Sequence, residues 1–378
     1  MIKMPNVQNA KRLASRASEH INAKNLVLGA AGIGAAGAIA GLMAGAGVAL
    51  AARAFWNGLT LADISGQSVL ITGASRGLGF AMAQEFARQG CRLAICARSD
   101  EELEVAAAQL RAMGAEVLTI ACDVTIQDDV QKMVQQVIAE FGQIDILVNN
   151  AGVIQVGPLQ SQTVADFQEA MDTMFWAHVY TTLAVLPHMT ARRSGRIANI
   201  TSIGGKIAVP HLIPYSSAKF AAVGFSEGIT AELAKDRIKV TTVCPGLMRT
   251  GSHENAYFKG DHRKEYAWFS LGASSPLTAI GARRAARSIV NAVRRGQAEV
   301  ILSVPAKAAA LFHGIAPGTT AQILGVTNRL MPGSNATNPD RHRGFESKSM
   351  VSESPLTALG RRAAEKLNQR AVPKEELA

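Results

Sequence analysis

Residues 67–79, QSVLITGASRGLG, decide the fold. The run QSVLIT is short and apolar, as in a buried strand, and a helical pattern, FAMAQEFARQG, follows at residues 80–90. Between them, Gly73, Gly77 and Gly79 let the backbone turn sharply and approach a pyrophosphate, which the first amides of the next helix can bind. This segment predicts a phosphate-binding turn, and a tight turn without a ligand is the simpler alternative.

The alternation of strand and helix continues along the chain. Strand patterns recur as RLAICA at residues 92–97, VLTIACD at 117–123 and DILVNNAG at 145–152, and helical patterns separate them, the first over residues 100–113. Strands that alternate with helices in this way form βαβ units on a parallel sheet. We therefore predict an α/β fold with a doubly wound parallel sheet and helices on both faces.

The end of the second strand predicts the cofactor. An acidic side chain there would bind a ribose 2′-hydroxyl, whereas an arginine accommodates a 2′-phosphate. Arg98 follows this strand, and Arg76 lies inside the glycine turn. The nearby acidic residues fit helix capping, because Ser99 and Glu102 form an S-x-x-E capping box. We therefore predict NADP(H).

Three residues further along can carry acid–base chemistry. The strand pattern RIANITS at residues 196–202 ends in Ser202, and YSSAK follows at residues 215–219. On a helix, Tyr215 and Lys219 share one face. A neighbouring ammonium favours the phenolate and lowers a tyrosine pKa. Tyr215 can then protonate a carbonyl oxygen to which Ser202 donates a hydrogen bond.

Six motifs occur in the order and spacing of one known family: TGASRGLG, CDV at 122–124, NNAG at 149–152, Ser202, YSSAK, and PGLMRT at 245–250. In these, residues 66–305 resemble the short-chain dehydrogenase/reductase family of the YxxxK type. The resemblance implies a Rossmann fold with a seven-stranded parallel sheet, a catalytic set of Ser202, Tyr215 and Lys219, and a single-domain active site. The cofactor-binding residues that it implies are Gly73, Ser75, Arg76, Gly77, Leu78 and Gly79 at the pyrophosphate, Asp123 and Val124 at the adenine, Asn150, Ala151 and Gly152 beside the ribose, Pro245, Gly246 and Thr250 around the nicotinamide, and Tyr215 and Lys219.

One position departs from the family pattern. The family usually has an asparagine 13 residues before the proline of the LP pair that ends the fourth helix, and here Met174 stands in that place relative to Pro187. The asparagine helps to hold a water for proton relay to the lysine. Met174 either disturbs this relay or is a core residue beside another polar group.

Composition and charge narrow the class of protein. The chain has 378 residues, 48% of them hydrophobic, and a net charge of +10. Residues 1–25 and 306–378 each contribute +4, and the region between them contributes +2. A nucleic-acid-binding protein would concentrate basic residues on its folded module, so we expect no nucleic-acid partner. The four cysteines form no CxxC pair and lie in apolar runs, which favours reduced, buried thiols, and no pattern predicts a metal site.

The region before the catalytic domain suggests a membrane anchor. Residues 26–52 carry no charge and span about 40 Å as a helix, enough to cross a bilayer. They follow a basic leader, residues 1–25, and precede a linker, residues 53–65. The alternatives are a cleaved signal sequence and a soluble Gly/Ala-rich helix. The charged leader would place the catalytic domain outside the cytoplasm. The cofactor and the thiols favour the cytoplasm, so we expect membrane association by a shallow, re-entrant or interfacial insertion.

The chain has two further features after the motifs. Aromatic residues gather at 257–269 (Tyr257, Phe258, Tyr266, Trp268 and Phe269), where they either contact a bulky apolar substrate or pack onto the domain. In the C-terminal extension, residues 306–378, an amphipathic helix is predicted from Ser354, with Leu356, Leu359, Ala363 and Leu367 on one side. This helix docks on the domain, pairs with another subunit in a homo-oligomer, or lies on a membrane through Arg361, Arg362, Lys366 and Arg370.

Together these features predict a membrane-associated oxidoreductase that uses NADP(H) to interconvert a lipophilic ketone or aldehyde and its alcohol. The alternative is a cofactor-binding membrane scaffold or sensor that has lost efficient catalysis, and Met174 is the observation that favours it.

Overall fold

The structure, a computed structural model, describes residues 61–332 and 336–370, which belong to one compact unit, Leu61–Ala378. The predicted leader, the predicted membrane segment at 26–52 and most of the linker lie outside the described residues. Among the described residues, no helix is both long enough and apolar enough to span a bilayer.

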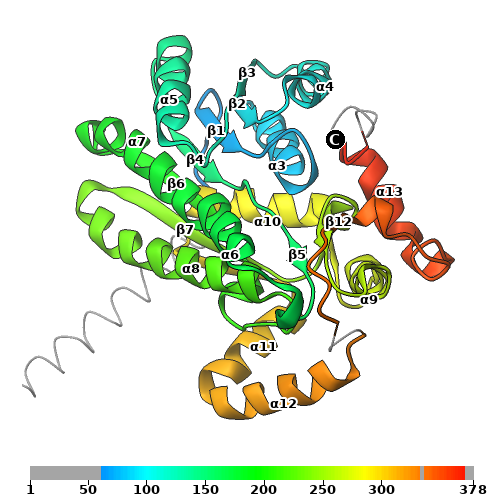
Figure 1. Cartoon of the computed structure of the whole chain (residues 1–378). Coiled ribbons are helices and arrows are strands. Elements are labelled where there is room, and N and C mark those ends of the chain that lie inside the picture. The colour runs from blue at the N-terminus through cyan, green and yellow to red at the C-terminus, as the bar shows by residue number, and fades with distance from the viewer. Residues whose placement is uncertain (1–60, 333–335, 371–378) are drawn as a thin grey trace, which may run out of the picture. The chain divides into compact units, whose positions relative to one another are not determined.

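A seven-stranded parallel sheet forms the centre of this unit (Figure 1). Its order is β11-β7-β6-β4-β1-β2-β3. The strands are β1 (Ser68–Thr72), β2 (Arg92–Ala97), β3 (Val117–Ala121), β4 (Ile146–Asn149), β6 (Gly195–Ile200), β7 (Ile238–Pro245) and β11 (Glu299–Leu302). The chain order changes direction between β1 and β4, where doubly wound sheets bind ligands at the carboxyl ends of their strands. The predicted doubly wound sheet is confirmed.

Helices cover both faces of the sheet, and each face has its own hydrophobic core (Figure 1). One core lies under α3 (Gly77–Arg88), α4 (Asp100–Arg111) and α10 (Ala282–Arg295). The other lies under α5 (Gln127–Phe141), α7 (Ala177–Arg192) and α8 (Ile213–Leu233). Strands β1 and β4 are buried along their whole length, as expected for strands covered on both sides.

Shorter elements lie around the carboxyl edge of the sheet. They are α6 (Val164–Met171), a π-helical turn (Asp172–Trp176), α9 (His262–Ser274), the small strands β5 (Gln155–Val156), β9 (Tyr257–Phe258) and β12 (His342–Arg343), and the pair β8 (Met248–Arg249) and β10 (Ile280–Gly281). The C-terminal extension contains α11 (Val304–Ile315), α12 (Pro317–Leu330) and α13 (Ala358–Lys366).

The predicted tail helix exists, but its start and its apolar face are partly wrong. Residues 355–357 form a 3₁₀ turn, and α13 begins at Ala358. Leu356 and Leu359 are exposed, whereas Thr357, Gly360, Ala364 and Leu367 are buried because α13 packs on α9 through its small residues. The described tail therefore docks on its own domain, and its exposed leucines lie on the opposite side.

Candidate active site

Ser202 and Tyr215 meet beyond the carboxyl end of β6. Ser202 follows this strand, and its hydroxyl accepts a hydrogen bond from the Gly204 amide at 2.9 Å. The same hydroxyl hydrogen-bonds with Tyr215, from the first turns of α8. A Cβ added at Gly204 would lie 3.2 Å from the Tyr215 ring and 3.3 Å from the Ser202 oxygen. The absence of a side chain at Gly204 therefore lets the two hydroxyls approach each other.

Lys219 lies one turn along α8 from Tyr215, on the same face. Its ammonium is buried, donates a hydrogen bond to the Ile200 carbonyl at 2.8 Å, and lies 5.8 Å from the centre of the Tyr215 ring. Burial lowers the pKa of Lys219 to about 8. Its charge is therefore anchored to the backbone of β6 beside the tyrosine.

The expected lowering of the Tyr215 pKa by Lys219 is wrong. Burial raises the pKa of Tyr215, and the hydrogen bond with Ser202 offsets only part of this effect. Desolvation of the phenolate is the larger of these two effects. Tyr215 is therefore a protonated acid at neutral pH.

Met174 occupies the position where the family has asparagine. It is buried in the π-helical turn and packs with Ala170, Ala218 and Tyr215, so it is a core residue. His178 lies on the next turn, also buried, and neither of its ring nitrogens has a hydrogen-bond partner among the described residues. Burial and then the charge of Lys219 lower the pKa of His178 well below its usual value. The imidazole of His178 is therefore neutral and lies within electrostatic range of Lys219.

The glycine turn has no room for side chains at its closest approaches. A Cβ at Gly79 would lie 2.2 Å from the Gly73 carbonyl oxygen, and one at Gly73 would lie 2.9 Å from the Ala151 Cα. Gly73 and Gly77 have positive φ angles of 63° and 61°. The side chain of Asn150 donates hydrogen bonds to the carbonyls of Thr72 and Gly73, both at 2.9 Å. The NNAG motif, which follows β4, therefore fixes the glycine turn by hydrogen bonds to its backbone.

Arginines gather where the 2′-phosphate was predicted. Arg76 forms an ion pair with the buried Glu102, and Ser75 donates a hydrogen bond to the same carboxylate at 2.9 Å. Burial lowers the pKa of Arg76, Glu102 acts against this, and the charges of Arg343 and Arg98 lower it further. Arg98 and Arg343 therefore both lie within electrostatic range of Arg76, which pairs with Glu102.

Of the two hydrogen bonds of the predicted capping box, only the one from the Glu102 backbone amide to Ser99 forms. The Ser99 hydroxyl accepts a hydrogen bond from the Glu102 amide at 3.2 Å, but the Glu102 carboxylate turns to Arg76 and Ser75. The charge of Arg76 attracts this carboxylate more strongly than a neutral backbone amide does.

The remaining predicted cofactor residues lie along the carboxyl edge of the sheet. Asp123, after β3, accepts two hydrogen bonds from Thr125, at 3.0 and 2.8 Å, and Val124 beside it is buried. Pro245 ends β7, and the buried Thr250 follows in the next loop. Three further motif residues lie at this edge: Leu78 in the first turn of α3, Gly152 after β4, and Gly246 after β7.

The aromatic segment mainly packs onto the domain. Phe258, Tyr266 and Phe269 are buried together in a small core with Val156. Tyr257 instead stacks against Arg341 and Arg343. The centre of its ring lies 4.0 Å from the guanidinium carbon of Arg341 and 4.3 Å from that of Arg343. Trp268 packs against the same core, so the packing alternative describes four of the five aromatic residues.

Sequence reasoning missed the contributions of the C-terminal extension. Arg343 lies within electrostatic range of Arg76, and Leu367 and Asn368 contact the glycine turn. All three lie more than 250 positions after this turn, and no local motif links them to it. His178 was missed as well, because a lone histidine in a helical pattern carries no signal of its own.

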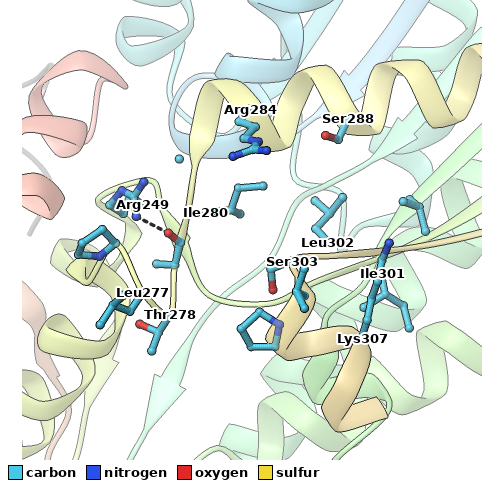
Figure 2. Close-up of a pocket in the computed structure, with 16 residues that line it drawn as sticks. Arg249, Leu277, Thr278, Ile280, Arg284, Ser288, Ile301, Leu302, Ser303 and Lys307 are labelled. Carbon is cyan, nitrogen blue, oxygen red and sulfur yellow. Dashed lines mark hydrogen bonds between the residues drawn. The ribbon is translucent and has the colours of Figure 1, made fainter. Parts of the chain in front are cut away.

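A cavity of about 540 Å³ lies elsewhere, between α10, α11 and the segment before β10 (Figure 2). Arg249, Arg284 and Lys307 line it, and Arg249 donates hydrogen bonds to the carbonyls of Ala279 and Ser275. None of the residues predicted for catalysis or cofactor binding lines this cavity.

Comparison with known proteins adds to this geometry. The family described as short chain dehydrogenase matches residues 67–259. The chain is similar to the rat 17-beta-hydroxysteroid dehydrogenase 13, with 40% identity over 51% of this chain and 65% of the relative. It is also similar to a dehydrogenase/reductase SDR family protein 7-like from Anopheles gambiae, with 36% identity over 67% of this chain and 80% of the relative.

Solved structures have the same architecture. A short-chain dehydrogenase from Streptomyces avermitilis has a TM-score of 0.61 and 28% identity, over 70% of this chain and 98% of that one. A variant of the actinorhodin polyketide ketoreductase, solved with NADPH, has a TM-score of 0.55 and 28% identity, over 63% of this chain and 95% of that one.

Proposed function

The chain belongs to the short-chain dehydrogenase/reductase family, and from this premise we propose that it uses NADP(H) to interconvert a lipophilic ketone or aldehyde and its alcohol at a membrane. The coarser statement, that the protein is an oxidoreductase acting on CH–OH groups, follows from the family. The meeting of Ser202, Tyr215 and Lys219 at one end of the sheet carries the proposal.

The residues around the glycine turn fit a dinucleotide with a 2′-phosphate. Side chains are excluded from the turn at Gly73 and Gly79, and no side chain of α3 caps its own N-terminus. Amides at a helix N-terminus bind anions such as a pyrophosphate, and of those in the first turn of α3 that of Gly77 donates to the Leu367 carbonyl. Arg76, Arg98 and Arg343 bring three positive charges against the one negative charge of Glu102. This balance favours NADP(H) over NAD(H).

The chain's own residues supply the acid–base part of the reaction. When bound, the reduced nicotinamide supplies a hydride to the carbonyl carbon. Ser202 donates a hydrogen bond to the carbonyl oxygen, and Tyr215 holds at its phenol oxygen the proton that this oxygen needs. The positive charge of Lys219, anchored on the Ile200 carbonyl, stabilises the phenolate that remains. Alcohol oxidation uses the same groups in reverse.

Two observations support a lipophilic substrate at a membrane. Two of the similar proteins bear the names of a hydroxysteroid and an estradiol dehydrogenase. Residues 26–52 are apolar and uncharged and precede the catalytic domain. A bulky apolar substrate partitions into lipid, so an enzyme held at the bilayer meets it at high local concentration. We place the catalytic domain on the cytoplasmic side, where its four free, buried cysteines stay reduced.

A substrate panel tests the activity. NADPH oxidation is measured with short, long-chain and polycyclic ketones and aldehydes, and NADH is the matched control. We expect turnover with the larger apolar carbonyls and at least tenfold lower efficiency with NADH. Binding of NADPH without turnover on any carbonyl would instead support the scaffold or sensor.

Membrane association has a separate test. In a flotation assay with vesicles, a chain that begins at Phe55 is expected to stay in the dense bottom fraction. The full chain is expected to float with the vesicles. Equal flotation of the two proteins would reject residues 26–52 as the anchor.

We also propose a homo-oligomer through the outer face of α7 and α8. Trp176, which ends the π-helical turn before α7, Leu183 of α7 and Phe220 of α8 are 42%, 55% and 41% exposed. Clustered large apolar side chains on a surface mark protein interfaces. Sedimentation of the Leu183→Arg variant should give a smaller species than the wild-type protein, and an unchanged sedimentation coefficient would count against this face.

A further inference from the structure

The end of the described chain runs between the two segments expected to hold the cofactor. Residues 367–370, which we name the clasp, follow α13 and contact the glycine turn after β1 on one side and the loop after β8 on the other. In the sheet, β4 and β6 lie between β1 and β7. The clasp therefore joins the two segments expected to hold the pyrophosphate and the nicotinamide.

On the side of the glycine turn, the clasp accepts a hydrogen bond from the first amide of α3. The Gly77 amide donates a hydrogen bond to the Leu367 carbonyl at 2.8 Å. The Asn368 side chain donates to the Ser75 carbonyl at 3.4 Å and accepts from Gln109 of α4 at 3.0 Å. A Cβ at Gly77 would lie 2.8 Å from the Gln369 amide nitrogen, so Gln369 lies directly over this glycine.

On the other side, the clasp holds the loop that contains Thr250. The Gln369 side chain donates to the Thr250 carbonyl at 3.3 Å and accepts from Asn255 at 2.6 Å. Arg370 forms a two-pronged ion pair with the buried Glu254. Paired, charge-assisted contacts of this kind are stronger than neutral hydrogen bonds and fix orientation.

The composition of the clasp supports a specific docking. Asn368 and Gln369 are only 7% and 4% exposed, although amide side chains are costly to bury without partners. Each finds hydrogen-bond partners on residues of the turn or the loop. Asn368 also adopts a left-handed conformation, φ 57°, which turns the chain out of α13 toward the cleft. A tail that merely rested on the surface would need neither feature.

We propose that the clasp is a gate for the dinucleotide: it closes the cleft between the glycine turn and the Thr250 loop, and it must undock for the cofactor to enter or leave. This inference rests on the proposed binding of NADP(H). The helix that leads into the clasp, α13, itself packs against α9.

Stopped-flow fluorescence of NADPH tests the gate without turnover. The release rate is measured by displacing bound NADPH with excess NADP⁺, for the wild-type protein, the Gln369→Ala/Arg370→Ala double variant, and a chain that ends at Lys366. Arg362→Ala is the matched control, because this exposed residue of α13 makes none of the clasp contacts. We expect association and release both to be at least tenfold faster in the two clasp variants, and unchanged in the control.

The outcomes separate the gate from the proposed function. Binding of NADPH by every protein with release rates within twofold of the wild type would overturn the gate and leave the proposed cofactor in place. Failure of the wild-type protein to bind NADPH would overturn both. Hydrogen exchange gives a second readout: amides 367–370 are expected to exchange more slowly when NADPH is bound, and faster exchange would contradict closure over the cofactor.

Discussion

The ammonium nitrogen of Lys219 lies 5.8 Å from the centre of the Tyr215 ring, one turn along α8, while it donates a hydrogen bond to the Ile200 carbonyl at the end of β6. A helix and a strand thus fix the charge relative to the phenol. Burial, which raises the pKa of Tyr215, keeps this residue protonated, as an acid for carbonyl reduction requires. Its conjugate base forms only as the proton leaves for the substrate.

Replacing Tyr215 by phenylalanine should remove turnover and leave cofactor binding intact. The ring keeps its packing against Met174, and only the proton-donating hydroxyl is lost. We expect kcat to fall by about 10²–10⁴-fold, the range for loss of a general acid. The dissociation constant of NADPH, from fluorescence titration, should change by less than about threefold. Tyr180→Phe, on α7, is the control, and turnover by Tyr215→Phe within tenfold of the wild type would contradict this role.

Lys219 should make folding stability depend on pH. Burial lowers its pKa to about 8 in the folded protein, below the value near 10.4 of an unfolded chain. Between these values the unfolded chain holds more protons, so the free energy of unfolding rises with pH in this window, and below about pH 8 the cost of the buried charge is present in full. Lys219→Met lacks this group.

The difference between the two proteins isolates this residue, since all other groups are shared. The unfolding free energy of the wild-type protein should gain about 3 kcal/mol on that of Lys219→Met between pH 8 and pH 10.5. Urea titrations at several pH values measure the difference. Parallel curves for the two proteins would mean that Lys219 is not desolvated in solution.

Arg76 and Glu102 should set the choice between cofactors in opposite directions. Arg76→Ala removes a charge beside the expected 2′-phosphate, so NADPH should bind about 10–100-fold more weakly, a loss of about 1.4–2.8 kcal/mol, while NADH changes little. Glu102→Gln removes the competing carboxylate and should tighten NADPH binding relative to NADH. Arg111→Ala, at the end of α4, is the control. Equal effects on both cofactors would place Arg76 in a structural role.

The geometry of the edge that carries Tyr215 and Lys219 can be predicted from the sequence because local rules govern it. The strand-to-helix turn at Gly73 and the placement of Tyr215 and Lys219 on one helix face depend on neighbouring residues. The partner of Glu102 could not be predicted, because it depends on whether a carboxylate meets a distant guanidinium or a nearby amide. Long-range contacts such as Gly77 with Leu367 have no signal in either segment alone. The apolar face of α13 was misplaced because its small residues pack closely and leave its leucines outside.

Two glycine-to-alanine substitutions should change the stability in opposite directions, one because the site has no room for a side chain and the other because alanine favours a helix. A Cβ at Gly79 would lie 2.2 Å from the Gly73 carbonyl oxygen, a backbone atom, so Gly79→Ala must distort the turn. We expect a loss of about 1–3 kcal/mol in unfolding free energy together with weaker NADPH binding. Gly224, on α8, is exposed and has no atom within 4 Å of such a Cβ, so Gly224→Ala should stabilise the protein by about 0.5–1 kcal/mol. Thermal and urea unfolding measure both effects, and a Gly79→Ala protein as stable as the wild type would show that the turn relaxes without cost.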